Sequence, residues 1–121
     1  MIEIQKPKQY DLEDRCLKFA KDCREFIRII PRTLSNIEDC KQLTRSSGSV
    51  GANYIEANEA LSKRDFIMRI KISRKEVKES RYWLKLIYLK GDELLTNEQN
   101  RLIQESTELM NIFGSIIRKS E

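Results

Sequence analysis

The sequence contains no histidine and few turn-forming residues. Its 121 residues include only 4 Gly and 2 Pro, too few for the many turns of a β-sandwich or β-barrel. The absence of histidine excludes Ser-His-Asp and Cys-His catalytic centres, and also zinc or iron sites that use histidine ligands. Any enzyme built on this chain would have to use carboxylates, lysine, tyrosine or cysteine.

Long hydrophobic runs are also missing. No apolar stretch approaches the 18 or so residues of a membrane-spanning helix, and residues 1–7 lack the apolar core of a signal peptide, so we expect a cytoplasmic protein. Cys16, Cys23 and Cys40 do not have the spacing of metal ligands, which favours reduced thiols packed in the core. We expect no metal and no cofactor.

Apolar residues recur at alternating steps of four and three, the spacing of amphipathic helices. The chain has the length of one domain, so residues 1–121 are expected to form a single unit in which residues 1–10 are loosely ordered. Short loops make neighbouring helices antiparallel. The predicted fold is therefore all-α, an antiparallel up-down four-helix bundle with helices at about 12–30, 34–61, 63–90 and 97–119.

Local signals set the expected helix ends. Pro31 stops the first helix, because the residue before a proline avoids helical angles. Ser62 is the expected N-cap of the third helix, and Gly91 its C-terminal cap. Thr96 is the expected N-cap of the fourth helix, with Gln99 completing a capping box.

Small residues occupy interior positions of two predicted helices. Gly48, Gly51 and Ala52 lie within one turn of the second helix, where glycine costs about 1 kcal/mol relative to alanine. We therefore expect another helix or a ligand to approach closely there. Ser73 and Ser80 fall on the apolar stripe of the third helix, and we expect them to allow close helix contact or to bond to backbone carbonyls.

Positive charge is concentrated in one helix. Residues 63–90 hold 10 basic and 3 acidic residues, net +7, although the whole chain carries only +4. Four lysines share one face at steps of three, four and seven, and a tyrosine lies within that row. The candidate nucleic-acid-binding residues are Lys63, Arg64, Lys71, Arg74, Lys75, Lys78, Arg81, Tyr82 and Lys85.

Regularly spaced cations are typical of a surface that binds a polyanion by displacing counterions from phosphates. Tyr82 could stack on a base. The alternative is a solvated helix face whose lysines keep the protein soluble. The sequence has no base-reading motif, so binding should depend on shape and backbone, with structured RNA or an RNA–DNA hybrid as the expected partner.

Acidic pairs favour a rival, enzymatic interpretation. Glu76 and Glu79 share a face of the third helix, and Glu105 and Glu108 repeat that spacing on the fourth. Two such pairs on facing helices could hold Mg²⁺ through carboxylate oxygens. This arrangement is superficially similar to the all-α nucleoside-triphosphate pyrophosphohydrolases, although Glu108 stands where those enzymes usually have Asp.

A structural role for the first pair is the competing prediction. If the second and third helices form a hairpin that turns near residue 62, Arg45 lies opposite Glu79. An ion pair between them, joined by Glu76, would fix the hairpin register. Trp83 lies one turn beyond Glu79 and is expected in the core or at a subunit interface.

Two stretches carry a family resemblance, residues 42–57 (QLTRSSGSVGANYIEA) and residues 75–84 (KEVKESRYWL), the latter preceded by Asp65-Phe66. Over residues 10–117 the chain resembles the bacterial four-helix bundle proteins called 23S rRNA-intervening-sequence proteins. These resemble the accessory protein of diversity-generating retroelements, a basic ring of five bundles. The resemblance implies no catalytic residues. Its motif residues, structural or interface candidates, are Arg45, Asn53, Glu56, Glu76, Glu79 and Trp83.

Together these observations predict a non-enzymatic, oligomeric bundle, a homopentamer by resemblance, that binds RNA or an RNA–DNA hybrid through its third helix. Multivalency in a ring would strengthen weak single contacts. Two alternatives stay open: a protein-interaction adaptor with a merely solvated basic face, and a Mg²⁺-dependent nucleotide pyrophosphohydrolase. The third helix could face outward or line a basic pore.

Overall fold

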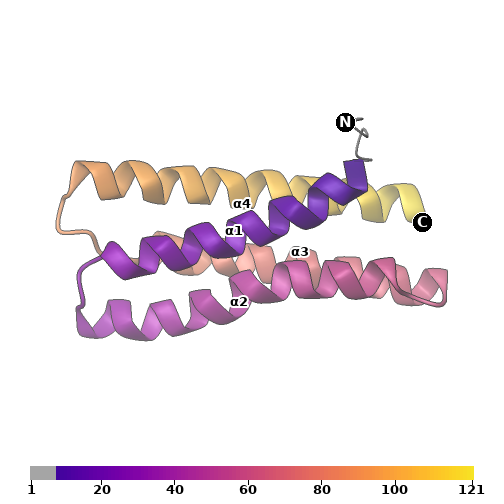
Figure 1. Ribbon diagram of the computed structural model, residues 1–121, viewed down its shortest axis with the longest axis horizontal. Helices are drawn as coiled ribbons and strands as arrows, with labels where there is room; N and C mark the ends of the chain where they lie inside the picture. The colour runs from indigo at the N-terminus through magenta and orange to yellow at the C-terminus, as the bar shows by residue number, and fades with distance from the viewer. Residues whose placement is uncertain (1–7) are drawn as a thin grey trace, which may run out of the picture.

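The computed structural model describes residues 8–121, which fold into an up-down bundle of four antiparallel helices (Figure 1). The start of the first helix and the end of the fourth lie at one end of the bundle, together with the loop between the second and third helices. The predicted all-α fold is confirmed. The helices are α1 (Lys8–Ile29), α2 (Leu34–Asn58), α3 (Lys63–Leu86) and α4 (Glu93–Ser120).

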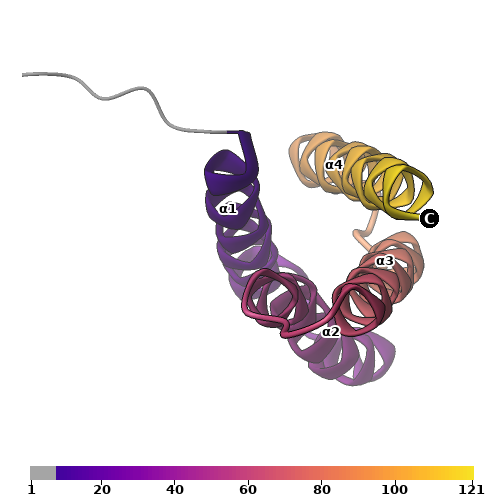
Figure 2. The ribbon, with the colours of Figure 1, turned by 90° about the vertical axis from the view of Figure 1, so that its right-hand side faces the viewer.

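The predicted apolar stripes form the core. On α1 the entire stripe is buried, from Leu12 to Ile30, because steps of three and four keep these side chains on one face of the helix. Each helix packs against its sequence neighbours, and α2 with α3 forms the most extensive interface. The view along the bundle shows α2 and α3 close together, whereas α1 and α4 lie farther apart (Figure 2).

Small polar side chains allow α2 and α3 to approach closely. Ser73 Oγ donates a hydrogen bond to Val50 O at 2.9 Å, and Ser80 Oγ donates to Glu76 O at 3.0 Å. The hydroxyls of Ser46 and Ser80 lie 2.8 Å apart. The expectation that the stripe serines mediate helix contact and bond to carbonyls is confirmed.

The glycines of α2 allow a close approach by α1. A Cβ atom added at Gly51 would lie 3.1 Å from Cys16 Cβ, and one at Gly48 would lie 3.3 Å from Arg24 Nη2. The sequence predicts that another helix or a ligand approaches this patch of small residues, and the structure shows that helix α1 does so.

Helix ends on the first half of the chain differ from the predictions by a few residues. α1 begins at Lys8, so residues 8–10 are helical, and the rest of the segment predicted as loosely ordered lies outside the described residues. α2 ends at Asn58 rather than at 61, since Glu59 N and Ala60 N bond to carbonyls only three residues back. Leu61, the last residue of the helix predicted over 34–61, is 99% exposed in the turn.

The predicted end of α3 and start of α4 are wrong. α3 ends at Leu86, and Gly91, predicted to cap it, lies instead in the following turn with φ of 77°. The N-cap of α4 is Asp92, which accepts a hydrogen bond from Leu95 N at 3.0 Å, and not Thr96. The Ser62 cap of α3 is confirmed by a 3.0 Å bond from Asp65 N.

Side chains from distant elements explain these shifted ends. Asn36 Nδ2 donates to Tyr88 O, and Tyr88 N donates to Asn36 Oδ1, at 2.8 and 2.9 Å. Gln99 Nε2 donates to Leu84 O in the last turn of α3 and to Ile87 O of the residue directly after the helix. These bonds satisfy a helix end that would otherwise leave carbonyls without partners. No described helix is long and apolar enough to span a membrane.

Candidate nucleic-acid interface

Four lysines of α3 lie along one outward-facing line. Lys71, Lys75, Lys78 and Lys85 are all exposed, as expected for steps of three, four and seven on the side opposite the buried Ile70, Val77 and Leu84. We call these four residues the lysine row. At a rise of 1.5 Å per residue, the row extends about 21 Å along the helix.

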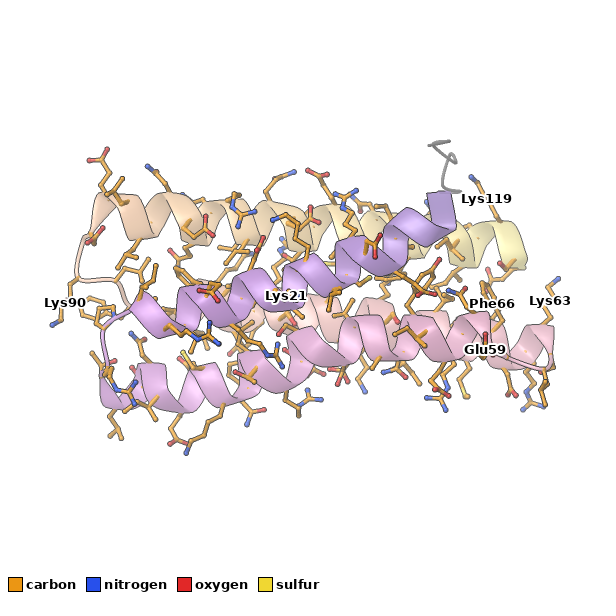
Figure 3. The ribbon with its side chains drawn as sticks, in the orientation of Figure 1. Lys21, Glu59, Lys63, Phe66, Lys90 and Lys119 are labelled. Atoms are coloured by element: carbon orange, nitrogen blue, oxygen red, sulfur yellow. The ribbon has the colours of Figure 1, made fainter. Side chains whose placement is uncertain are left out.

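Two further side chains continue the line of the row towards the start of α3. Arg64 and Met68 fall on the same helical spacing, and both are exposed, Met68 at 48%. Sequence reasoning did not include Met68, although its position between Arg64 and Lys71 would have placed it there. Lys63 lies beside them at the extreme end of the bundle, opposite the end that carries Lys90 (Figure 3).

The acidic residues of α3 leave the row free. Glu76 and Glu79 point towards α2, where each has a carboxylate oxygen 3.0 Å from Arg45 Nη2. Within the described residues, Lys75, Lys78 and Lys85 form no ion pair. Their charges are therefore available to a ligand.

The predicted pairing of Arg45 with both carboxylates is confirmed. Glu76 is only 8% exposed, so Arg45 compensates an almost buried charge, while Glu79 lies nearer the surface. The hydrogen bond to Glu76, partly offset by desolvation, raises the pKa of Arg45.

Arg81, one of the predicted binding residues, lies beside the row and is directed towards α4. Its Nη1 donates to Met110 Sδ at 3.6 Å, and its Nε is buried. Arg74 is exposed but lies over α4, with Nε 3.5 Å from a Cβ added at Gly114. Both arginines therefore lie on the α4 side of the helix.

The N-terminal basic residues border a shallow hollow at the end of the molecule. Lys63, Arg64 and Lys71 line it together with Glu121. Lys71 Nζ lies 3.9 Å from Glu121 Oε2, a loose and exposed pair that contributes little stability. Lys71 is thus the member of the row whose charge has a neighbouring acid.

Tyr82 lies between Lys78 and Lys85 and is 57% exposed. Its ring meets Trp83 edge to face, with centroids 5.1 Å apart and an interplanar angle of 73°. Trp83 is partly buried against the core, so the prediction of a core position is confirmed in part. This contact fixes the direction of an otherwise solvent-exposed tyrosine ring.

The four carboxylates proposed to hold Mg²⁺ do not meet. Glu105 and Glu108 bind Arg15 of α1, with N···O distances of 2.8 and 2.7 Å, whereas Glu76 and Glu79 bind an arginine of α2. Among the side chains that the structure describes, no three acidic or cysteine groups lie close enough to hold a metal ion. Arg15, which sequence reasoning missed, bridges α1 and α4.

The cysteines are poor nucleophiles. Cys16 and Cys23 are buried and free, and burial raises the pKa of each thiol to about 12. A thiol with such a pKa carries almost no reactive thiolate at neutral pH.

The sequence profile of the 23S rRNA-intervening sequence protein family matches residues 8–115. The chain belongs to this family. A crystal structure of a protein with unknown function from the S23 ribosomal protein family of Bacteroides thetaiotaomicron is 31% identical, with a TM-score of 0.75. The match covers 87% of this chain and 96% of that one. Curated protein sequences give no significant match.

Four of the residues that carry the resemblance to 23S rRNA-intervening sequence proteins lie at the α2–α3 interface, namely Arg45, Asn53, Glu76 and Glu79. Besides Arg45, Asn53 bonds to Ser49 O through Nδ2 and accepts a 3.0 Å bond from Arg69 Nη1. Glu56 is exposed on α2. The family motif thus sets the hairpin register, and the lysine row lies on the other side of α3.

Proposed function

We propose that this protein is a non-enzymatic nucleic-acid-binding bundle that holds RNA, or an RNA–DNA hybrid, through phosphate contacts from α3. The observation that carries the proposal is the lysine row, whose last three members have no acidic partner among the described residues. The acids of the same helix are turned towards α2 or lie at its start. A helix of this kind presents nearly unopposed positive charge to a polyanion.

The row is long enough to meet several phosphates. At an axial rise of about 3.4 Å per base pair, its length of about 21 Å spans about six base pairs of a duplex laid parallel to α3. If all four lysines replace counterions, the logarithm of affinity should fall with that of salt at a slope of about −3 to −3.6.

Assembly would strengthen such binding. We propose a cytoplasmic homo-oligomer, a pentamer by the resemblance, in which several copies of the row act together. The apolar groove between α1 and α2, lined by Leu17, Ala20, Ala52 and Ile55, is a candidate subunit contact. The free buried cysteines suit a reducing compartment.

The test replaces all four lysines of the row. Lys71, Lys75, Lys78 and Lys85 are changed to Glu, and binding of a labelled structured RNA is titrated from 50 to 500 mM salt by fluorescence anisotropy. The wild type should bind more tightly than about 1 μM near physiological salt with the slope above, and the variant should lose binding.

A matched control changes four exposed basic residues elsewhere to Glu, each without an ion pair among the described residues, so that net charge falls by the same amount: Lys21, Arg32, Lys90 and Lys119. This control should retain most of the affinity and the salt slope. Equal losses in both variants would mean that net charge alone governs binding, and flat wild-type titrations would refute the proposal. Circular dichroism and light scattering verify fold and assembly.

A second candidate function is a protein-interaction adaptor. It is favoured by exposed apolar side chains at the end of the bundle that holds the α1–α2 and α3–α4 loops (Figure 1). There Leu34 is 82%, Leu94 80%, Ile29 60% and Tyr88 56% exposed. Binding of a partner protein by an adaptor should not change when the four lysines of the row are replaced. The same variant therefore separates the two functions.

A further inference from the structure

Tyr82 differs from the lysines around it because it offers a flat aromatic face to solvent. It lies four residues after Lys78 and three before Lys85, on the outer side of α3. Along the helix axis these lysines are about 6 Å and 4.5 Å away. The Trp83 ring meets the tyrosine ring in an edge-to-face contact, which helps to hold the tyrosine ring in place, and Tyr82 remains 57% exposed.

The surroundings of Tyr82 favour a nucleic acid over a protein partner. Protein interfaces are enriched in tyrosine, but their cores are depleted of lysine, and here lysines lie on both sides of the ring. Along the helix axis Lys78 and Lys85 lie about 10.5 Å apart, with Tyr82 between them. An aromatic face between two phosphate-binding cations is the arrangement that binds a base together with its flanking backbone.

Bases inside a continuous duplex are stacked on one another and cannot reach such a ring. Sequence-tolerant recognition of single-stranded segments instead uses aromatic side chains on which unstacked bases lie. We therefore propose that Tyr82 is a stacking platform for one unpaired base, and that the target contains unpaired nucleotides, as a loop, a bulge or a single strand. This inference rests on the proposed function and names its substrate class.

The test compares a 12-nucleotide single-stranded RNA with a blunt RNA duplex of the same length. Tyr82→Ala should weaken binding of the single strand by about 5- to 100-fold, the loss measured when a stacked aromatic is truncated. Binding of the duplex should stay unchanged, because the lysine row is intact. Tyr82→Phe keeps the aromatic face and should bind like the wild type, whereas Tyr82→Leu keeps apolar bulk alone and should behave like Tyr82→Ala.

Tyr88 supplies the matched control. It is 56% exposed but lies beyond the end of α3, and Tyr88→Ala should leave both affinities unchanged. The single tryptophan gives a second readout, since Trp83 contacts the ring. Single-stranded RNA should change its fluorescence in the wild type and in Tyr82→Phe, and should change it far less in Tyr82→Leu.

The possible failures can be told apart. Equal single-strand affinities for wild type and Tyr82→Ala would overturn the stacking role while leaving the lysine row intact. Altered oligomer mass in Tyr82→Ala with unchanged affinity would assign the ring to a subunit interface and also overturn it. No binding of either RNA by the wild type would refute the proposed function itself.

Discussion

At the scale of single residues, Gly48 and Gly51 of α2 have different structural surroundings. Glycine is unfavourable within a helix by about 0.5–1 kcal/mol relative to alanine, so each position needs a reason. At Gly51 the nearest atom to an added methyl group is Cys16 Cβ, a rigid part of a buried side chain. At Gly48 it is Arg24 Nη2, the far end of a flexible one.

The two alanine substitutions should therefore have different outcomes. Gly48→Ala should raise the free energy of unfolding by about 0.5–1 kcal/mol, because the arginine can move aside and the helix gains its propensity. Gly51→Ala should give no gain, and Gly51→Val should lower the free energy of unfolding by about 1–3 kcal/mol through overpacking. Urea denaturation monitored by circular dichroism measures each. Equal gains in the free energy of unfolding at both positions would show that α1 can shift away from Gly51. The close approach of Cys16 would then not require glycine there.

At the scale of helices, the sequence predicts the core better than the helix ends. The stripe from Leu12 to Ile30 was identified by period alone, because a buried face repeats along one helix. The end of α3 could not be identified that way, since its partners Asn36 and Gln99 belong to α2 and α4. Sequence windows contain no information on contacts 52 residues apart, and the apolar pattern continues to Leu89 after the helix has ended.

The candidate site was likewise predictable where helical spacing decides exposure, and not where contacts with other helices decide it. Exposure of Lys75, Lys78 and Lys85 followed from helical spacing relative to the apolar stripe. The direction of Arg81 did not, because a long side chain at the edge of the stripe can lean towards either neighbour, and Met110 of α4 decides it. The pairing of Arg45 with Glu79 was predictable, since a hairpin with a short turn fixes the register of its two helices.

Asn36 should be a key residue for the end of α3. Its side chain is 1% exposed and bonds to Pro31 O, Tyr88 O and Tyr88 N. Asn36→Ala would leave these partly buried backbone groups without their partner, so we expect a loss of about 1–3 kcal/mol in the free energy of unfolding. Equilibrium urea denaturation would measure it. Asn100→Ala, at an exposed position of α4, is the control and should change stability by less than about 0.5 kcal/mol.

A loss below about 1 kcal/mol for Asn36→Ala would mean that water replaces the amide, and the proposed role in ending the helix would be wrong. Amide hydrogen exchange offers a local check. Protection of Tyr88 N should fall in Asn36→Ala before that of the α2–α3 interface, because Asn36 Oδ1 is its acceptor.

At the scale of the whole molecule, the four helix interfaces are held by different forces. The α2–α3 interface is extensive and close-packed, whereas the α1–α4 interface is the least extensive of the four. Arg15 and Arg101 bridge that weaker interface through Glu105, Glu108 and Asp22. Charge thus contributes most where packing contributes least, and conditions that remove the charge should act there first.

Acid should open the bundle between α1 and α4. Burial alone would raise the pKa of Asp22, but hydrogen bonds from Lys18 and Arg101 outweigh it and lower that pKa. The hydrogen bond from Arg15 lowers the pKa of Glu108. A carboxyl whose pKa is lower in the folded state stabilises the fold above its unfolded value, about 3.9 for Asp and 4.3 for Glu, and loses that contribution as pH falls further. The melting temperature should therefore fall steeply below about pH 4.

Asp22→Asn tests whether the ion pairs of the α1–α4 interface cause this sensitivity to acid. The variant should melt below the wild type at pH 7 and approach it at pH 2, because the wild-type carboxyl is then neutral as well. Asp14→Asn, at an exposed α1 position without an ion pair among the described residues, should follow the wild-type curve throughout. A constant offset between Asp22→Asn and wild type across the pH range would mean that packing rather than charge is lost. Hydrogen exchange at pH 3 should then locate the opening, with amides of α1 and α4 exposed before those of α2 and α3.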